Sequence, residues 1–292
     1  MDRRKLIRQL TLGSLALTSI NSLSAASCNN DTEKKAGKRI NHSVCRWTYN
    51  FLSLDELCTS VKSLGFAAID LVGPKDWTTL KKHGVHSSMC NGAEISLTEG
   101  WNNKQYHATL LKNYKSHIDM VADAGYTNLI CFSGNRNGMD DETGLKNSAE
   151  GLKQLMSQAE KRGVIIQMEL LNSKVDHKDY MCDRSDWGVE LCKQIGSPNF
   201  KLLYDIYHMQ IDEGDVIRTI QTHQTFFGHY HTAGVPGRHE IDDTQELYYP
   251  AIMRAIADTG FKGYVAQEFI PTGKDNATKI AALQKAVQIC DV

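Results

Sequence analysis

The sequence lacks several features that would point to particular classes of protein. Its 33 basic and 34 acidic residues nearly balance, which leaves a net charge of −1. This balance lacks the excess of positive charge with which proteins attract nucleic acid or an anionic membrane surface. None of its eight cysteines forms a Cys-x-x-Cys pair. Several of them, including Cys45, Cys90 and Cys131, lie in apolar runs, where buried free thiols are expected.

A long apolar run is also missing. Residues 10–23 are mildly apolar, but threonine, serine and glycine interrupt them, so they fall short of the ~20 apolar residues of a spanning helix. The pair Arg3-Arg4 before this stretch, and the small residues at 24–26 after it, predict that residues 1–27 are an export signal of the twin-arginine type. An ordinary secretory signal or an unstructured tail is the alternative.

Residues 28–40 are polar and charged and have no periodic hydrophobic pattern, which predicts a linker. Cys28 follows Ala25-Ala26-Ser27, so lipid attachment at Cys28 is an open alternative. Together these features predict an exported, periplasmic protein, lipid-anchored if Cys28 is modified.

From residue 41 onward the chain alternates between helical and strand-like stretches. Six amphipathic stretches end in glycine and are followed by a strand-like run; these glycines are Gly65, Gly84, Gly125, Gly163, Gly196 and Gly260. Ser53 and Glu56 form a capping box before one helix. Eight strands are expected, at residues 43–49, 67–72, 85–90, 128–133, 165–170, 201–206, 228–232 and 263–269.

Eight strands, most of them followed by a helix, predict an α/β fold in which residues 41–292 form a single (β/α)8 TIM barrel. The doubly wound alternative often has a Gly-x-Gly-x-x-Gly turn after its first strand, and none occurs here. The longest connections, at residues 92–106, 134–143, 172–186 and 233–249, would lie on the catalytic face of such a barrel.

Four side chains that can bind a metal lie at or near the ends of the last four predicted strands. Glu169, Asp205, His231 and Glu268 are separated by 36, 26 and 37 residues, which is close to one strand-plus-helix unit. Parallel strands end on the same side of the sheet, so the four should converge. Three carboxylates with one imidazole favour Mn²⁺ or Mg²⁺, with Co²⁺ or Zn²⁺ as alternatives.

Two of these four residues are glutamates on well-separated strands, which suits proton transfer. With a small sugar-like substrate on the metal, Glu169 and Glu268 could each reach a carbon-bound proton, and the metal would stabilise an enediolate. The chemistry would be aldose–ketose isomerisation or epimerisation beside a carbonyl. It needs no organic cofactor, and the sequence carries no signature of one.

Other polar residues follow these strands and are candidate substrate contacts. His208 could touch a substrate oxygen, or cap the next helix. Arg238 could pair with a substrate carboxylate or phosphate, or form a structural pair with Glu240 or Asp242. Asn172, Lys174 and His177 follow Glu169 and are weaker candidates. Trp47, Trp101 and Trp187 could wall the pocket, although core packing is the commoner role for each.

Several segments together resemble hydroxypyruvate isomerases, which belong to the wider xylose-isomerase-like TIM-barrel group that includes ketose 3-epimerases. The resemblance covers residues 41–272, and its motifs are Met-Glu-Leu-Leu-Asn at 168–172, Tyr-Asp-Ile-Tyr-His-Met-Gln at 204–210, Gly-Val-Pro-Gly-Arg-His-Glu at 234–240, Tyr-Pro at 249–250 and Gln-Glu-Phe at 267–269. It implies that Glu169, Asp205, His231 and Glu268 hold the metal, with Glu169 and Glu268 as the acid/base pair. It also implies that His208 and Arg238 meet the substrate.

The resemblance predicts a hydroxypyruvate isomerase-like enzyme acting on a small sugar or hydroxy-keto acid. These isomerases typically have glutamine at the third ligand position, whereas this chain has His231, as the ketose epimerases do. A ketose 3-epimerase is therefore a second interpretation, and an exported, non-catalytic sugar-binding protein is a third. A metal-dependent endonuclease would need a basic groove, which the charge balance disfavours. Barrels of this group often pair, so a homodimer is an open expectation.

Overall fold

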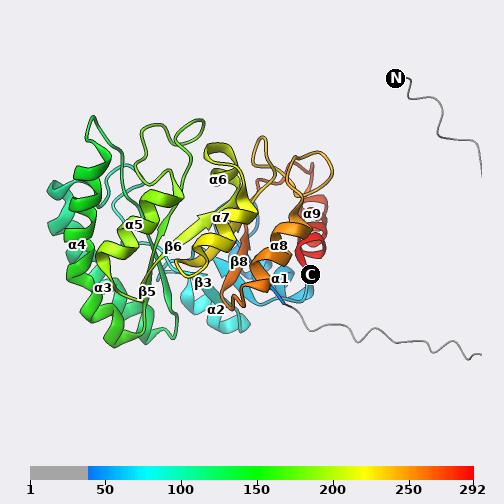
Figure 1. The fold of residues 1–292 in the computed structure, drawn as a ribbon. Helices are drawn as coiled ribbons and strands as arrows, with labels where there is room; N and C mark the ends of the chain where they lie inside the picture. The colour runs from blue at the N-terminus through cyan, green and yellow to red at the C-terminus, as the bar shows by residue number, and fades with distance from the viewer. Residues whose placement is uncertain (1–38) are drawn as a thin grey trace, which may run out of the picture. The chain divides into compact units, whose positions relative to one another are not determined.

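The structure, a computed structural model, describes residues 39–292. Within this range, eight strands alternate with helices, and the helices surround the strands (Figure 1). The strands are β1 (Asn41–Val44), β2 (Ala68–Asp70), β3 (His86–Met89), β4 (Asn128–Cys131), β5 (Ile165–Glu169), β6 (Phe200–Asp205), β7 (Phe227–Thr232) and β8 (Tyr264–Gln267).

The helices have the starts and ends that the sequence indicates. Ser53 and Glu56 form the expected capping box at the start of α1. Gly163 ends α4 with φ 68°, a left-handed conformation that costs glycine no steric energy. The α-helices are α1 (Leu54–Ser63), α2 (Trp77–His83), α3 (His107–Asp123), α4 (Asp141–Arg162), α5 (Ser185–Ile195), α6 (Ile206–Asp212), α7 (Val216–His223), α8 (Tyr249–Asp258) and α9 (Asn276–Cys290), with short 3₁₀ helices η1 (Arg46–Tyr49) and η2 (Lys104–Tyr106).

The strands pair in parallel and close into a ring. Six form one sheet in the order β1-β8-β7-β6-β5-β4, and β2 pairs with β3. Two single parallel bridges, Cys45 with Asp70 and Cys90 with Leu129, join the two sheets. Every strand is thus connected to the next, and all carboxyl ends open on one face of the barrel.

The core lies between the strands and the surrounding helices. Leu202 of β6 packs against Gly188 of α5, where an added Cβ would lie 2.9 Å from Cδ1 of Leu202. Buried Tyr114 of α3 donates its hydroxyl hydrogen to the carbonyl oxygen of Ile130 in β4, at 2.8 Å. The seven cysteines of residues 39–292 are all buried and free, as expected for those in apolar runs.

The predicted TIM barrel is confirmed, but the first strand was predicted wrongly at its end. The prediction ran it to Tyr49, whereas β1 ends at Val44 and residues 46–49 turn into η1. This segment alternates in polarity like a strand, but its backbone instead forms a tight turn: the Thr48 hydroxyl donates to the carbonyl oxygen of Cys45, and Arg46 to that of Tyr49. The turn brings Trp47 to the mouth of the barrel.

The predicted export signal (1–27), the lipid anchor at Cys28 and nearly all of the predicted linker (28–40) lie outside the described residues, so they stay predictions. Among the helices of residues 39–292, none is both long enough and apolar enough to span a membrane.

Candidate metal and active site

The four side chains at the ends of the last four strands come together at the mouth of the barrel. Glu169 and Asp205 are the last residues of β5 and β6, His231 is the last but one of β7, and Glu268 directly follows β8. Each can offer one ligand atom such that all four atoms lie within 4.8 Å of one another. All four residues are buried. The strand-end rule thus predicted a cluster that the fold assembles.

The imidazole of His231 lies at the centre of this cluster. Its Nδ1 is 3.1 Å from Oε1 of Glu169, 3.1 Å from Oε2 of Glu268 and 3.9 Å from Oδ2 of Asp205. One nitrogen therefore faces three carboxylates that come from three different strands.

The cluster places three carboxyl groups close together in a buried environment. Burial and the negative charge of Glu268 raise the pKa of Asp205 well above its usual value, and burial raises the pKa of Glu169. Burial alone would raise the pKa of Glu268 too, but the positive charges of Arg238 and His231 hold it well below its ordinary value. Carboxylates that resist ionisation in this way mark a place where a further cation would be stabilised.

The donor set fits a divalent cation. Oδ2 of Asp205 is buried, and among the described residues it has no hydrogen-bond partner. Its nearest side-chain nitrogens, Nε2 of His208 and Nη2 of Arg238, are 3.6 and 3.7 Å away. A buried carboxylate oxygen without a donor is costly unless something else satisfies it. Three carboxylates and one imidazole are suitable ligands for Mn²⁺, Mg²⁺, Co²⁺ or Zn²⁺.

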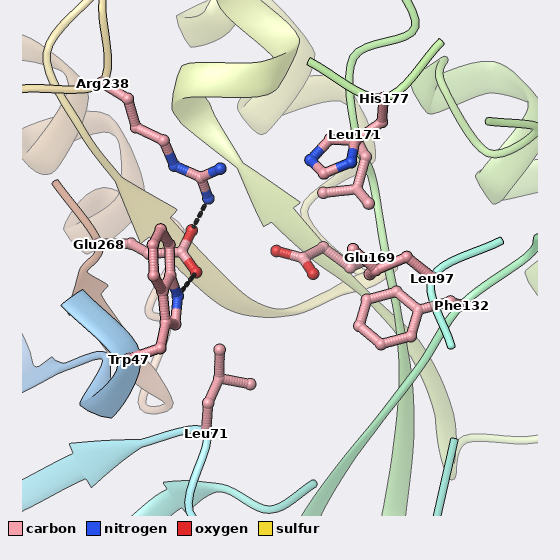
Figure 2. Close-up of a pocket in the computed structure, with 9 residues that line it drawn as sticks. All are labelled: Trp47, Leu71, Leu97, Phe132, Glu169, Leu171, His177, Arg238 and Glu268. Atoms are coloured by element: carbon pink, nitrogen blue, oxygen red, sulfur yellow. Dashed lines mark hydrogen bonds and ion pairs between the residues drawn. The ribbon is translucent and has the colours of Figure 1, made fainter. Parts of the chain in front are cut away.

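A pocket of about 330 Å³ opens directly over the cluster. Figure 2 shows the carboxylates of Glu169 and Glu268 facing each other across it. The remaining walls are mostly apolar, from Trp47, Leu71, Leu97, Phe132 and Leu171, with His177 and Arg238 at the rim. This volume is at the lower end of the roughly 300–1,000 Å³ of small-molecule sites.

Arg238 reaches this pocket from the loop between β7 and α8. Its Nη2 donates to Oε2 of Glu268 at 2.5 Å, and its guanidinium carbon lies 5.1 Å from the ring centre of Trp47 and 5.3 Å from that of Tyr207. Its backbone has φ 60°, an unusual value for a residue with a side chain. Strained residues of this kind are often found at functional sites.

His208 lies behind the cluster rather than at the open surface. Nδ2 of Asn172 donates to Nδ1 of His208 at 2.6 Å, and the same amide donates to Oδ2 of Asp176 at 2.6 Å. Burial and the positive charge of Arg238 lower the pKa of His208 well below its usual value. The imidazole is therefore neutral, with its hydrogen on Nε2, and this buried nitrogen has no hydrogen-bond partner among residues 39–292.

The three other predicted substrate contacts, His177, Asn172 and Lys174, lie in three different environments. His177 lines the pocket, and its ring centre is 5.1 Å from that of His208. Asn172 is fully buried and supports His208 from behind. Lys174 is not among the residues that line the pocket; its Nζ donates to the carbonyl oxygens of Ile211 and Asp212 at the end of α6.

Sequence reasoning missed Asp70 and His229, and it named Trp47 only as one of three tryptophans that could wall the pocket. Asp70 ends β2 and lies 3.0 Å from Nε2 of His231, while His229 of β7 lies 2.8 Å from the other oxygen of Asp70. Trp47 is 39% exposed and donates its indole N–H to Oε1 of Glu268 at 2.8 Å, whereas Trp101 and Trp187 are core residues. The strand-end rule that found the other four acidic and imidazole side chains applies equally to Asp70, so a signal for it was present.

The fold and the site define a class of protein: an α/β barrel with a carboxylate–imidazole cluster beneath a small pocket. Residues 60–287 match the xylose isomerase-like TIM barrel family, and the chain belongs to this family.

Similar proteins agree with this assignment. The chain is 35% identical over 128 residues to 2-oxo-tetronate isomerase of Cupriavidus necator, covering 44% of this chain and 48% of that protein. It is 32% identical over 106 residues to a putative hydroxypyruvate isomerase of Homo sapiens, covering 36% and 38%. The matches thus span about half or less of these relatives. The structure of D-psicose 3-epimerase with D-tagatose from Clostridium cellulolyticum H10 has the same fold, with a TM-score of 0.70, 18% identity, and coverage of 86% and 98%.

Proposed function

We propose that this protein is a metal-dependent isomerase of small hydroxy-carbonyl compounds or sugars, similar to the hydroxypyruvate isomerases. The observation that carries the proposal is the arrangement of Glu169 and Glu268. They face each other across a small pocket and share one cluster of ligand atoms with Asp205 and His231. The isomerase relatives support the same reaction class.

Glu169, Asp205, His231 and Glu268 would hold the cation. When bound, such a cation would supply Lewis-acid chemistry, namely polarisation of a substrate carbonyl oxygen and stabilisation of negative charge on it. The apolar walls around the cluster exclude water and so strengthen every electrostatic interaction within it.

The two glutamates transfer the proton. A substrate between them presents the carbon next to its carbonyl group to one carboxylate, which removes the proton from that carbon. In isomerisation, a glutamate returns the proton to the neighbouring carbon, and the hydroxyl proton of the substrate moves to the former carbonyl oxygen. In epimerisation, the glutamate on the opposite wall returns a proton to the other face of the same carbon. Isomerisation or epimerisation follows from which carbon and which face receive it.

Arg238 and His208 orient the substrate. The guanidinium of Arg238 projects into the pocket and can pair with a substrate oxygen or carboxylate. His208 is neutral and does not line the pocket, so its free Nε2 hydrogen would reach a substrate oxygen only if that oxygen enters beside Oδ2 of Asp205, 3.6 Å from this nitrogen.

Incubation in deuterated water tests the reaction type. Hydroxypyruvate, 2-oxo-tetronate and a panel of small ketoses would be incubated with the Mn²⁺-loaded protein, and the position of deuterium in each product would be read by NMR. An aldose–ketose shift labels a different carbon from inversion at C3. Label at C3 with inverted configuration would replace the isomerase with the second candidate, a ketose 3-epimerase, which the fold neighbour favours.

A variant separates catalysis from mere binding. Glu268→Gln keeps the shape of the side chain but removes the base, so turnover should fall while sugar binding persists. Glu246→Gln is the matched control, because Glu246 is paired with Gln210 on the exposed surface. If wild type and Glu268→Gln both bound sugar equally and neither turned it over, the protein would be a sugar-binding protein and the proposal would fail.

A further inference from the structure

Asp70 lies behind His231, on the side away from the pocket. It is the last residue of β2 and is fully buried. Its Oδ1 is 3.0 Å from Nε2 of His231, the nitrogen opposite the one that faces Glu169 and Glu268. Asp70 thus contacts the imidazole of the cluster without lining the pocket.

The neighbours of Asp70 hold it in place. The hydroxyl of Ser88 donates to Oδ2 at 2.6 Å, and Nε2 of His229 lies 2.8 Å from the same oxygen. Cys45 approaches Oδ1 at 3.7 Å through its sulfur. These groups come from three different strands or strand ends, so the carboxylate is contacted from several directions within the barrel.

The chemistry of a carboxylate determines where the hydrogen of His231 lies. A carboxylate only accepts hydrogen bonds, so the Nε2 that faces Oδ1 must carry hydrogen. Nδ1 faces the three carboxylates of the cluster, so without a cation it carries hydrogen as well, and His231 is positively charged. A cation held by the cluster would replace the Nδ1 hydrogen, which leaves a neutral imidazole whose one hydrogen is on Nε2, toward Asp70. A metal-bound histidine commonly donates its second N–H to a carboxylate in this way, which fixes the ring and its tautomer.

We propose that Asp70 is the positioning residue of the metal centre: it holds His231 in the tautomer whose Nδ1 lone pair points to the cation position. This inference rests on the proposed function, because it assumes that a cation binds the cluster. Ser88 and His229 complete the arrangement by holding Asp70.

The same neighbourhood could be taken for a second metal site, since Cys45, Asp70 and His231 offer three ligand atoms close together. The contacts of Asp70 argue against it. Oδ2 already accepts from Ser88 and lies beside His229, and Oδ1 lies beside His231. A carboxylate with donors on both oxygens does not require a cation, so we expect one ion per chain.

The experiment compares Mn²⁺ binding by the wild type and by Asp70→Asn, with free Mn²⁺ measured by electron paramagnetic resonance. The amide of asparagine would place its N–H₂ group against one of the surrounding donors, and two donors cannot form a hydrogen bond. This disfavours the His231 tautomer that has its hydrogen on Nε2. We expect the dissociation constant to rise about 10- to 100-fold. Asp183→Asn is the matched control, because Asp183 is also a buried carboxylate but pairs with Arg136; its dissociation constant should stay within about threefold of the wild type.

A second measurement needs no variant and so does not depend on the folding of Asp70→Asn. In wild-type protein loaded with Mg²⁺ and labelled with ¹⁵N, NMR should show hydrogen on Nε2 of His231 and none on Nδ1. Hydrogen on Nδ1 would overturn the inference. So would a folded Asp70→Asn protein with unchanged affinity, or two Mn²⁺ ions per wild-type chain. If the wild type bound no cation, both the proposed function and this inference would fail. If it bound one cation but Asp70 had no effect on it, only this inference would fail.

Discussion

The two halves of the barrel mouth differ in chemistry. Glu169, Asp205, His231 and Glu268 lie at or next to the ends of strands β5 to β8, and all four are ionisable. The residues that follow β2, β3 and β4 and line the same pocket are Leu71, Leu97 and Phe132. One half therefore carries the groups that we propose bind a cation and move protons, and the other supplies most of the apolar walls, to which Leu171 after β5 adds one more. Apart from Leu171 and Asp70, chemistry and shape are encoded by different strands, so substitutions in the two halves should affect different kinetic constants.

The largest effect is expected from the glutamates of the polar half. Glu169→Gln and Glu268→Gln each remove a proton-transfer group and a cation ligand, so kcat should fall by a factor of about 10² to 10⁴ or more. Steady-state kinetics on the isomerised substrate would measure it, with Glu246→Gln as control. A variant that kept more than a tenth of wild-type kcat would show that the chemistry is not on that residue.

Arg238 should give the next largest effect. Its guanidinium donates to Glu268 and lies between the rings of Trp47 and Tyr207. Loss of a charged hydrogen bond costs roughly 1.5–3 kcal/mol, which corresponds to a fall of about 10- to 100-fold in kcat/KM for Arg238→Ala. Arg238→Lys keeps the charge but not the planar fork, so kcat/KM for this variant should lie between alanine and wild type. Equal values for lysine and alanine would mean that the charge plays no part.

A smaller effect, confined to KM, is expected from the apolar half. Phe132→Leu and Leu97→Ala reduce the apolar contact with the substrate but touch no group of the metal cluster. KM should rise about three- to tenfold, because each lost methylene contact is worth about 0.8 kcal/mol, and kcat should change less than threefold. A tenfold fall in kcat for either variant, with KM unchanged, would break the distinction between the two halves.

The smallest expected effect is a difference in the rate of amide hydrogen exchange between strands of the two halves. The strands β1 and β4–β8 form one continuous sheet, whereas β2 and β3 are joined to it only by single bridges. Amides of β2, such as Ile69, should therefore exchange with solvent faster than those of β6, such as Leu203. Native-state hydrogen exchange followed by NMR or mass spectrometry would compare residues 68–70 with residues 200–205. Equal protection would mean that the bridges hold the barrel as firmly as the continuous sheet does.

Much of this arrangement could be predicted from the sequence, because strand ends are marked by local patterns. Apolar runs that end in Glu169, Asp205 and Glu268 indicate both the strands and the face on which the side chains meet. Asp70 lies two residues before the end of the strand predicted at residues 67–72, between the apolar residues Ile69 and Leu71, so it is marked less clearly as a strand end. Its role became apparent only through the distance to His231, which joins residues 161 positions apart.

Other features depend on three-dimensional contacts that no local pattern reports. Trp47 reaches Glu268 because the chain turns into η1 after β1, against the strand-like alternation of that segment. Lys174 follows Glu169 by only five residues, yet its amine satisfies the carbonyl groups at the end of α6. Nearness in the sequence to a site residue therefore does not determine where a long side chain points.

The most direct test of the account is to count divalent cations bound to the protein with and without Asp205. Asp205 is assigned no proton transfer, so Asp205→Asn isolates the coordination of the cation. After incubation with Mn²⁺ and removal of the excess, elemental analysis should find one ion per wild-type chain and less than a tenth of that in folded Asp205→Asn protein. A wild-type chain that retains no ion, or a variant that retains as much as the wild type, would contradict a metal centre built by Glu169, Asp205, His231 and Glu268.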